Sequence, residues 1–592
     1  MSSRSDRIVA RSPSRPPAAQ SDDSPMMEQF WRAKKEAPDA LLFFRMGDFY
    51  ELFHEDAIVA SRALGLTLTS RSKGSPQPIP MAGVPVRAAD AYLVRLVKLG
   101  HKVAICEQLQ DPREAKGIVE RGIVRVVTPG TLTEENALDA RASNYLASLV
   151  LVGDRAGLAW VELSTGRMQG CEIDEGRVLD ELARLSPAEL LLAPEVLQQH
   201  PHWRTELAEH LGVALSEREA WRFAADGAMR ALTRHFRVKS LEGFGVEPES
   251  LLVPAAGALI EYVAETQRAA CEHILRLEPV VPDSFLLLDR ATRQCLELVE
   301  TQRERRREGS LLEVLDATLT PMGARTLRDW LLHPLRDVEA IRARLGAVAE
   351  LVEAPFLREE LREQLEQVLD VERLAGRIST ARANGRDLVA LGKSLAVIPV
   401  LRARLADSHS AALQRVCGEL DPLEDVTARI AAMLVDEPPL TLKEGGLVRP
   451  GFAPELDELR QIAGDAKSWM ARFQAEESVR SGIPGLKIGF NSVFGYYIEV
   501  PRGQVERVPS SYIRKQTVKA AERYVTPELK EFEDKVLNSE SLSFEREYEL
   551  FQELRAALAA ELARVLGSAR ALAELDALAS LAHVAAANRY TA

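Results

Sequence analysis

The sequence predicts a multidomain protein in which mixed α/β domains are followed by a mainly α-helical region. Its 592 residues exceed what a single hydrophobic core usually holds. Short apolar and alternating runs, typical of strands, concentrate before about residue 280 and between residues 486 and 525. From about residue 284 onward the other apolar residues recur every three to four positions, as they do in amphipathic helices.

Composition indicates a globular chain without a generally basic surface. Apolar residues make up 46% and charged residues 28%, and the formal net charge is -13. Any nucleic-acid contact must therefore come from local basic patches. The five cysteines show neither a CxxC motif nor metal-ligand spacing, which is typical of buried thiols in a reducing, cytoplasmic compartment. No apolar run reaches the roughly 18 residues of a membrane span, so we expect no membrane association.

The first part of the chain predicts a tail and then a mixed α/β domain. Residues 1–24 are rich in Arg, Ser and Pro and are expected to be disordered. The domain is expected over residues 25–136. A helix should end at Gly100, a common C-terminal stop. The expected helices are 26–35, 57–64 and 88–99, and the expected strands are 66–70, 102–108 and 121–127.

Residues 43–53 form the densest aromatic cluster in a chain with 6% aromatic residues. The run resembles a buried strand leading into a helix. Gly47-Asp48 interrupts it and places Phe49 just past a turn, with Glu51 two residues on. Core packing is the ordinary interpretation of such aromatics. An exposed Phe49 beside a carboxylate could instead enter a nucleic-acid stack and contact a base edge.

Residues 143–272 predict a second domain. Strands 145–152, 158–163 and 167–173 should form an antiparallel meander, because turn residues separate them. A helix over 178–185 and a buried strand over 190–192 follow, an order that suggests a ribonuclease-H-like fold. Such a fold is a nuclease when several carboxylates converge on two metals. Its strands carry essentially one candidate ligand, Glu162, with no partner carboxylate at a convincing position, so we expect a connector domain with no catalytic or metal site.

The spacing of apolar residues predicts that residues 284–442 are mainly helical. The periodic segments are 310–333, 338–352, 356–368 and 387–405. Gly392-Lys393-Ser394 looks like the end of a phosphate-binding loop, but Asp387 stands where that loop requires Gly. The segment also reads as continuous helix. We therefore expect no nucleotide site there.

Residues 443–541 predict a β insertion between two long helices. The helices are marked by apolar positions over 456–473 and 527–566, and the second could extend about 60 Å. Strand patterns occupy 486–500 and 511–525. Between residues 480 and 525 eight Lys and Arg residues face three Glu residues, the reverse of the overall charge sign. A solvated charged face is one explanation, and contact with phosphates is the other. The candidate contacts are Lys487, Asn491, Arg502, Arg514, Lys515, Gln516 and Lys519.

Seven short motifs, taken in order, resemble the MutS family of bacterial DNA mismatch-recognition proteins. The resemblance covers about residues 25–592. No single motif is decisive, but their order is highly specific. They are residues 45–51 (RMGDFYE), 79–83 (IPMAG), 103–108 (VAICEQ), 128–131 (TPGT), 241–246 (LEGFGV), 320–323 (TPMG) and 495–498 (GYYI).

The resemblance implies the domain roles. It implies recognition of mismatched or looped-out bases in double-stranded DNA, which starts mismatch repair through insertion of a Phe wedge and kinking. The Phe-x-Glu motif places the wedge at Phe49 and the base-contacting acid at Glu51, whose pKa the field of nearby phosphates should raise. A clamp in the insertion would hold backbone phosphates without sequence preference. The implied parts are mismatch-binding 25–136, connector 143–272, helical core and lever 284–442 with 542–592, and clamp 443–541.

The family's ATPase domain has no counterpart here. Family members continue into a domain with a Walker A loop, and no Gly-x4-Gly-Lys-Ser/Thr occurs in this sequence. We expect a fragment of a longer product, or else a DNA-binding or scaffold form without a motor. The chain itself is expected to bind no cofactor and not to be an enzyme. For the full-length protein the resemblance implies ATP and Mg²⁺, a homodimer, a MutL-type repair partner and a cytoplasmic, nucleoid-associated location.

Overall fold

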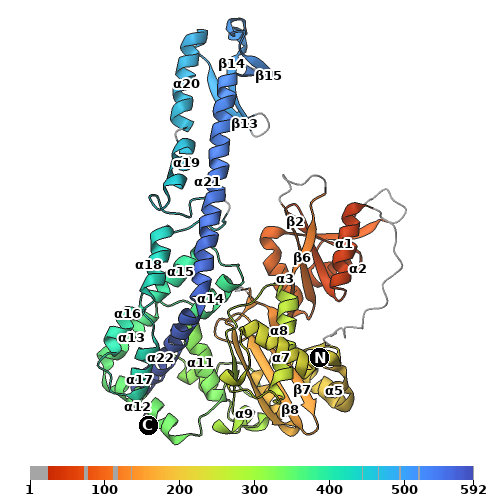
Figure 1. The fold of residues 1–592 in the computed structure, drawn as a ribbon, viewed down its shortest axis with the longest axis vertical. Helices are drawn as coiled ribbons and strands as arrows, with labels where there is room; N and C mark the ends of the chain where they lie inside the picture. The colour runs from red at the N-terminus through yellow and green to blue at the C-terminus, as the bar shows by residue number, and fades with distance from the viewer. Residues whose placement is uncertain are drawn as a thin grey trace. The chain divides into compact units, whose positions relative to one another are not determined.

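The computed structural model describes residues 24–71, 78–110, 118–134, 137–442, 445–464, 466–491, 495–517 and 521–590. The expected tail, apart from Ser24, lies outside these residues. The chain divides into two compact units. Unit 1 comprises Met1–Thr380, Pro399–Asp421 and Leu562–Ala592, and unit 2 comprises Ala381–Ile398 and Pro422–Glu561. Figure 1 shows the ribbon of both units, which are described separately below.

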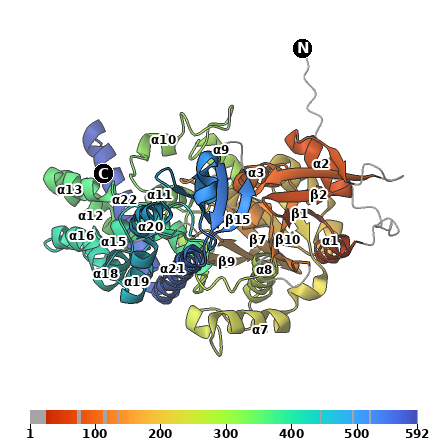
Figure 2. The same ribbon diagram turned by 90° about the horizontal axis from the view of Figure 1, so that it is seen from above.

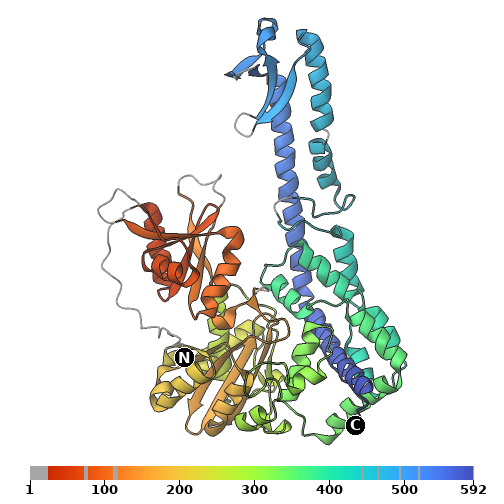
Figure 3. The same ribbon diagram turned by 180° about the vertical axis from the view of Figure 1, so that it is seen from behind.

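The first sheet of unit 1 lies between two helical layers. Its strand order is β3-β4-β2-β1-β5-β6; only β1 and β5 pair in parallel. Helix α1 (Pro25–Glu36) packs on one face, and α2 (His54–Leu64) and α3 (Ala89–Lys98) pack on the other (Figure 3). The strands are β1 (Ala40–Met46), β2 (Phe49–Phe53), β3 (Thr69–Arg71), β4 (Ile79–Pro85), β5 (Lys102–Gln108) and β6 (Arg121–Val127).

The aromatic run forms a hairpin rather than one strand that leads into a helix. Gly47 has a φ of +59°, a conformation that glycine adopts without a Cβ penalty. The chain therefore reverses at Gly47-Asp48 and continues as β2 before α2 begins at His54, earlier than expected. The strand expected over 66–70 is shorter and later, at Thr69–Arg71.

The second sheet of unit 1 contains the predicted meander. β7 (Tyr145–Val152), β8 (Arg155–Glu162) and β9 (Arg167–Asp174) pair antiparallel, as predicted. The order β11-β10-β7-β8-β9-β12 adds β10 (Glu189–Leu192) beside β7. The short strands β11 (Ala214–Glu217) and β12 (Leu277–Pro279) form the two edges.

Helices cover both faces of this second sheet. α8 (Leu252–Gln267) packs on one face, and α7 (Ala225–Phe236) packs on α8 (Figure 2). A Cβ at Gly157 would lie 2.0 Å from the carbonyl oxygen of Leu251, so this glycine permits the close approach of strand and helix. α4 (Val178–Leu185), α5 (Pro194–Gln199) and α6 (Pro201–Thr205) lie toward the other face.

The helical part of unit 1 is built around α22 (Leu562–Asn588), against which α11, α12, α13, α14 and α17 pack. The single helix expected over 310–333 is wrong. It is interrupted because the buried carboxylate of Asp576 accepts hydrogen bonds from Leu319 and Thr320. The helices are α9 (Arg290–Cys295), α10 (Leu311–Leu315), α11 (Pro321–Leu332), α12 (Val338–Glu353), α13 (Pro355–Leu365), α14 (Val371–Ser379), α16 (Ile398–Leu405) and α17 (Ala411–Glu419).

Unit 2 joins a helical base to a long helix with a small sheet near its start (Figure 1). α21 (Pro527–Ala560) has 34 residues and is about 51 Å long. The expectation of one helix to residue 566 is wrong, because α21 ends at Ala560 and the backbone of the next residue, Glu561, leaves the helical conformation with a ψ of 4°. The other helices are α15 (Gly385–Leu395), α18 (Glu424–Met433), α19 (Pro454–Gly464) and α20 (Ala466–Ser481).

The segment Gly392-Lys393-Ser394 lies inside α15, as the sequence predicted. Gly392 packs against Ile430 of α18, and the Ser394 hydroxyl donates to the Ala390 carbonyl at 2.9 Å. A helix interior cannot present successive backbone N–H groups to a phosphate, because those groups already bond within the helix. The helix expected over 387–405 is nevertheless divided into α15 and α16.

Two further observations concern the burial of the cysteines and the length of the apolar helices. Cys106, Cys171 and Cys271 are buried as expected, whereas Cys295 is exposed. Among the helices that the structure describes, none is both long enough and apolar enough to cross a bilayer.

Candidate nucleic-acid interface

The β1–β2 hairpin exposes one aromatic side chain from a strand that is otherwise mostly buried. Phe49 is 47% exposed, whereas Tyr50, Leu52 and Phe53 are at most 7% exposed. Phe49 is the first residue after the turn and pairs in register with Met46 and with Pro85. The N–H of Val86 donates to the carbonyl of Asp48 at 2.9 Å, which ties the turn to β4. The sequence therefore placed Phe49 correctly past a turn.

Phe49 and Glu51 share one face of the sheet, because side chains alternate along a strand. Phe44, the register partner of Glu51, lies on the same face but is covered by α1, whose Phe30 ring centroid is 5.8 Å away. Phe43, Phe44 and Phe53 are fully buried, as the packing interpretation required. Helix α1 thus covers the inner part of this face and leaves the turn end accessible.

The Phe49 ring lies against β4. A Cβ built on Gly83 would be 3.6 Å from Cδ1 of Phe49, an ordinary van der Waals separation. Gly83 is also the register partner of Glu51. This glycine of the 79–83 motif therefore forms the floor beside both candidate residues.

The Glu51 carboxylate is half-buried without a partner. Within the described part of the chain it makes neither an ion pair nor a hydrogen bond. Burial raises the pKa of this carboxyl above its ordinary value, and the positive charge of Arg71 opposes that rise. The sequence predicted that nearby DNA phosphates would raise the pKa of Glu51. In the structure, desolvation by the protein alone already raises it. The contribution of Arg71 was missed, because β4 brings β3 and β2 together from distant positions.

The predicted β insertion in unit 2 is a four-stranded antiparallel sheet, here called the clamp sheet, of order β13-β14-β16-β15. One face packs on α20 and α21, where the Trp469 and Phe532 rings stack with centroids 3.6 Å apart. The strands are β13 (Lys487–Asn491), β14 (Gly495–Pro501), β15 (Ile513–Thr517) and β16 (Ala521–Val525).

The candidate cations of the clamp sheet separate into unpaired and paired groups. Lys487, Arg502 and Lys515 are exposed and form no ion pair with any described residue. Arg514 is also exposed but lies 3.5 Å from Glu522. Of the remaining candidates, Lys519 and the side chain of Asn491 lie outside what the structure describes.

The side chain of Gln516 is hydrogen-bonded within the clamp sheet. Its side-chain oxygen accepts from Nη1 of Arg523 at 3.0 Å, and Arg523 also pairs with Glu499 at 3.1 Å. The Arg523 guanidinium lies 4.3 Å from the Tyr497 ring centroid. These contacts stabilise the face opposite the helices, so part of the positive charge counted from the sequence is neutralised internally.

A β-bulge lies at the two adjacent cations of β15. The register shifts between Arg514 and Gln516, so Lys515 has no partner on β16. A bulge places two residues opposite one and breaks the strict alternation of side chains. Arg514 and Lys515 are both exposed, as are Ile513 and Thr517 of this edge strand. Nothing in the local sequence predicts this bulge.

The 495–498 motif attaches the clamp sheet to α21. Gly495 has a φ of +76°, and a Cβ there would lie 2.2 Å from Oε1 of Glu533. The N–H of Tyr496 donates to the buried Glu533 carboxylate at 3.0 Å. The motif therefore fixes the start of β14 to α21 through a buried carboxylate.

Glu162, the one candidate nuclease carboxylate, has a structural role. It is buried, accepts from the Ser164 hydroxyl at 3.1 Å and lies 3.4 Å from Arg373 of α14. No group of three or more His, Cys, Asp or Glu residues able to hold a metal occurs in the described ranges.

Comparison with known proteins agrees with these features. Models described as MutS domain I, MutS domain II and MutS domain III match residues 24–136, 144–275 and 291–582. DNA mismatch repair protein MutS of Symbiobacterium thermophilum is 46% identical over 96% of this chain and 65% of its own length. The MutS proteins of Lachnoclostridium phytofermentans and Salinibacter ruber are 42% and 43% identical over 96% of this chain, and 61% and 63% of their own lengths. The chain thus spans less than two thirds of these relatives, and it belongs to the MutS family.

Proposed function

We propose that this chain recognises mismatched or looped-out bases in double-stranded DNA, with Phe49 as the inserting wedge and Glu51 as the base-contacting acid. The observation that carries the proposal is the half-exposed Phe49 ring on the same sheet face as an unpaired carboxylate. The relatives bear the name DNA mismatch repair protein, which supports this choice of substrate.

The physical basis of discrimination is the deformability of the duplex. Unstacking a base step costs a few kcal/mol and costs least where pairing is already poor. Stacking on an aromatic ring returns about 1–3 kcal/mol. The two terms are of similar size, so their sum changes sign between a mismatch and a normal pair.

Glu51 adds a second discriminating term. Its carboxylate repels the phosphates of an intact duplex, where it finds no partner. Its raised pKa favours a shared proton with a base nitrogen once a mispair is opened. The acid therefore disfavours non-specific complexes more than it disfavours the specific one.

The clamp sheet supplies contacts that do not depend on sequence. Lys487, Arg502 and Lys515 are placed to neutralise backbone phosphates, each with release of counterions. Arg514 joins them at the cost of its ion pair with Glu522. Lys519, Asn491 and Gln516 are the other proposed contacts.

The architecture that we propose follows the family. Residues 25–136 bind the mismatch, residues 143–272 form a ribonuclease-H-like connector, residues 284–442 and 542–592 form the core and lever, and residues 443–541 form the clamp. The chain itself acts by binding and not by catalysis. In complete family members we propose coupling to ATP and Mg²⁺, a homodimer, a MutL-type partner and a cytoplasmic, nucleoid-associated location.

The test is fluorescence anisotropy with matched and single-mismatch duplexes at fixed salt. Phe49→Ala should abolish the mismatch preference, a loss of about tenfold or more expected from one stacking contact. Phe356→Ala is the control, because this phenylalanine is 86% exposed on α13, far along the chain from the hairpin. A mismatch preference that survives in Phe49→Ala with unchanged circular dichroism would overturn the wedge.

A further inference from the structure

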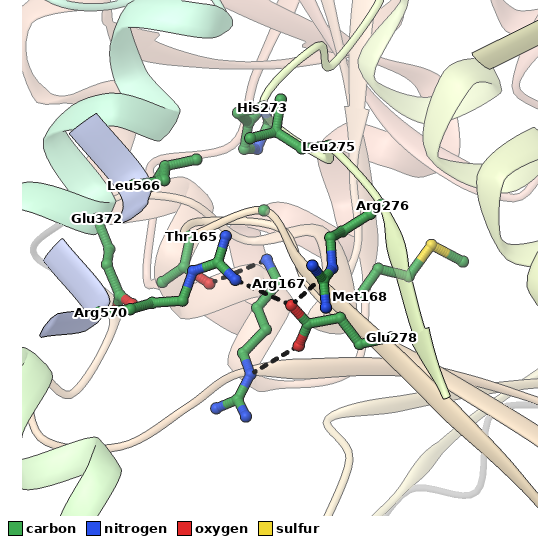
Figure 4. A pocket seen from close by; sticks show the side chains of 11 residues that line it. Thr165, Arg167, Met168, His273, Leu275, Arg276, Glu278, Glu372, Leu566 and Arg570 are labelled. Carbon is green, nitrogen blue, oxygen red and sulfur yellow. Dashed lines mark hydrogen bonds and ion pairs between the residues drawn. The ribbon is translucent and has the colours of Figure 1, made fainter. Parts of the chain in front are cut away.

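A hollow in unit 1 gathers three arginines around one carboxylate. Arg167 begins β9, Arg276 precedes β12 and Arg570 belongs to α22, and all three converge on Glu278 (Figure 4). The Glu278 carboxylate lies 3.0 Å from Nη1 of Arg570, 3.2 Å from Nε of Arg276 and 3.8 Å from Nε of Arg167. The proposed DNA contacts use none of these residues.

The local charge is positive. Glu372, at the rim, already pairs with Arg325 at 2.7 Å. Asp329 approaches the far end of Arg167 at 3.8 Å and also pairs with His333 at 2.9 Å. Glu278 is therefore the counter-charge that all three guanidinium groups share, although Asp329 acts more strongly than Glu278 on Arg167.

The hydrogen-bond inventory points in the same direction. Each guanidinium carries about five N–H donors, whereas a carboxylate offers about four acceptor positions. Arg570 and Arg276 share the same oxygen of Glu278. The side chains of Arg167, Arg276 and Arg570 are 40–56% exposed, so each is partly open to solvent.

The backbone holds these like charges close together. Leu277 pairs with Met168 in parallel register, which brings Arg276 and Arg167 to the same end of neighbouring strands. Gly166 permits the approach, since a Cβ there would lie 2.3 Å from the carbonyl oxygen of His273. Repulsion among clustered guanidinium groups is reduced when an anion binds between them.

We propose that this hollow binds a small phosphate-class anion, with Arg276 and Arg570 as its principal ligands and Arg167 as the third. Arginine suits the site because its planar fork pairs with phosphate in a bidentate manner. The hollow is small and open to solvent, so the arginines would meet a single phosphate group at the protein surface, whether of inorganic phosphate, of pyrophosphate or of a larger molecule.

The test is isothermal titration calorimetry of the whole chain with pyrophosphate, at constant ionic strength set with chloride. We expect saturable binding that weakens at least about tenfold in the Arg276→Gln/Arg570→Gln variant. Arg155→Gln is the control, because Arg155 is 51% exposed and pairs with Glu172 and Asp174 away from the hollow. Glu278→Gln should strengthen binding several-fold, since it frees donors and removes a competing charge.

The proposal would be overturned by an absence of saturable binding, or by equal affinity in the wild-type chain and the double variant. A weaker affinity after Glu278→Gln would also contradict it. Titration of a matched duplex distinguishes the source of the phosphate. An unchanged salt dependence in the double variant identifies a free anion, and a reduced slope identifies the DNA backbone. Because these residues lie outside the hairpin and the clamp sheet, failure here leaves the mismatch-binding proposal intact.

Discussion

The β1–β2 hairpin and the clamp sheet both present side chains from antiparallel strands, but their supports differ. The hairpin belongs to a sheet with helices on both faces, and it exposes one aromatic ring beside one unpaired carboxylate. Among its described residues, the clamp sheet has a hydrophobic core on one face and exposes several cations, some of them on an edge strand. The first arrangement suits a single contact that must be rigid. The second suits several interchangeable contacts, each worth little alone.

The two regions differ most clearly in the surroundings of two glycines, Gly47 in the hairpin turn and Gly495 at the start of β14. Gly47 and Gly495 both have positive φ, but only Gly495 abuts a buried group, Glu533. Gly47→Ala should lower the free energy of unfolding by about 1 kcal/mol, the usual left-handed penalty. Gly495→Ala should lower the stability of unit 2 by roughly 3 kcal/mol or more, because Glu533 is displaced as well. Hydrogen exchange of β2 and β14 amides measures both losses, and equal losses would contradict the difference in support.

The next largest expected effect is the loss of DNA affinity when exposed cations of the clamp sheet are replaced. The Lys487→Gln/Arg502→Gln/Lys515→Gln variant should weaken matched and mismatched duplexes alike, by roughly ten- to fiftyfold, and reduce the salt slope by about 2 to 3. Anisotropy titrations at several salt concentrations give both quantities. A control with the same change in charge replaces three exposed cations elsewhere, Lys239, Arg303 and Arg305, by Gln. A loss restricted to mismatched DNA would show that the clamp sheet reads sequence or structure.

Glu51→Gln should act on the matched duplex. Removal of the unpaired carboxylate should tighten matched-duplex binding by about three- to tenfold, because phosphate repulsion is lost, and selectivity should fall. Glu55→Gln, an exposed acid on α2 of the same domain, controls for the change in net charge. If both variants keep the wild-type selectivity in a salt-matched titration, Glu51 has no discriminating role.

The smallest effect concerns stability and pH. A carboxyl whose folded pKa is raised favours folding in its neutral form, and this contribution is lost as the pH rises from the ordinary value of 4.5 through the folded pKa. Glu51→Gln should therefore be more stable than wild type at pH 7, by a few tenths of a kcal/mol because the half-exposed group is screened by solvent. The difference should vanish at about pH 4. Urea denaturation at both pH values tests this, and an advantage that persists at pH 4 would show another cause.

Much of the local structure followed from the sequence. The strand boundaries of β5, β6 and β7 and the helix α4 agree with the predicted ones, because alternation and three-to-four spacing report directly on burial. The helix interruptions after α10 and after α21 could not be predicted from the sequence. Helical periodicity continues across both, and in the first case a distant side chain, Asp576, competes for the backbone N–H groups.

The sequence by itself determined the family, the turn at Gly47-Asp48, the position of Phe49 past that turn and the positive sign of the charge in the clamp insertion. Tertiary structure alone showed what the motif glycines are for. Gly130, Gly323 and Gly495 each lie against a buried carboxylate supplied by a remote segment: Glu189, Asp576 and Glu533. A Cβ at any of these positions would fall within 3.0 Å of that acidic side chain. The spacing of residues near each glycine does not predict which distant acidic residue packs against it, because that contact forms only when the sheets and helices pack together.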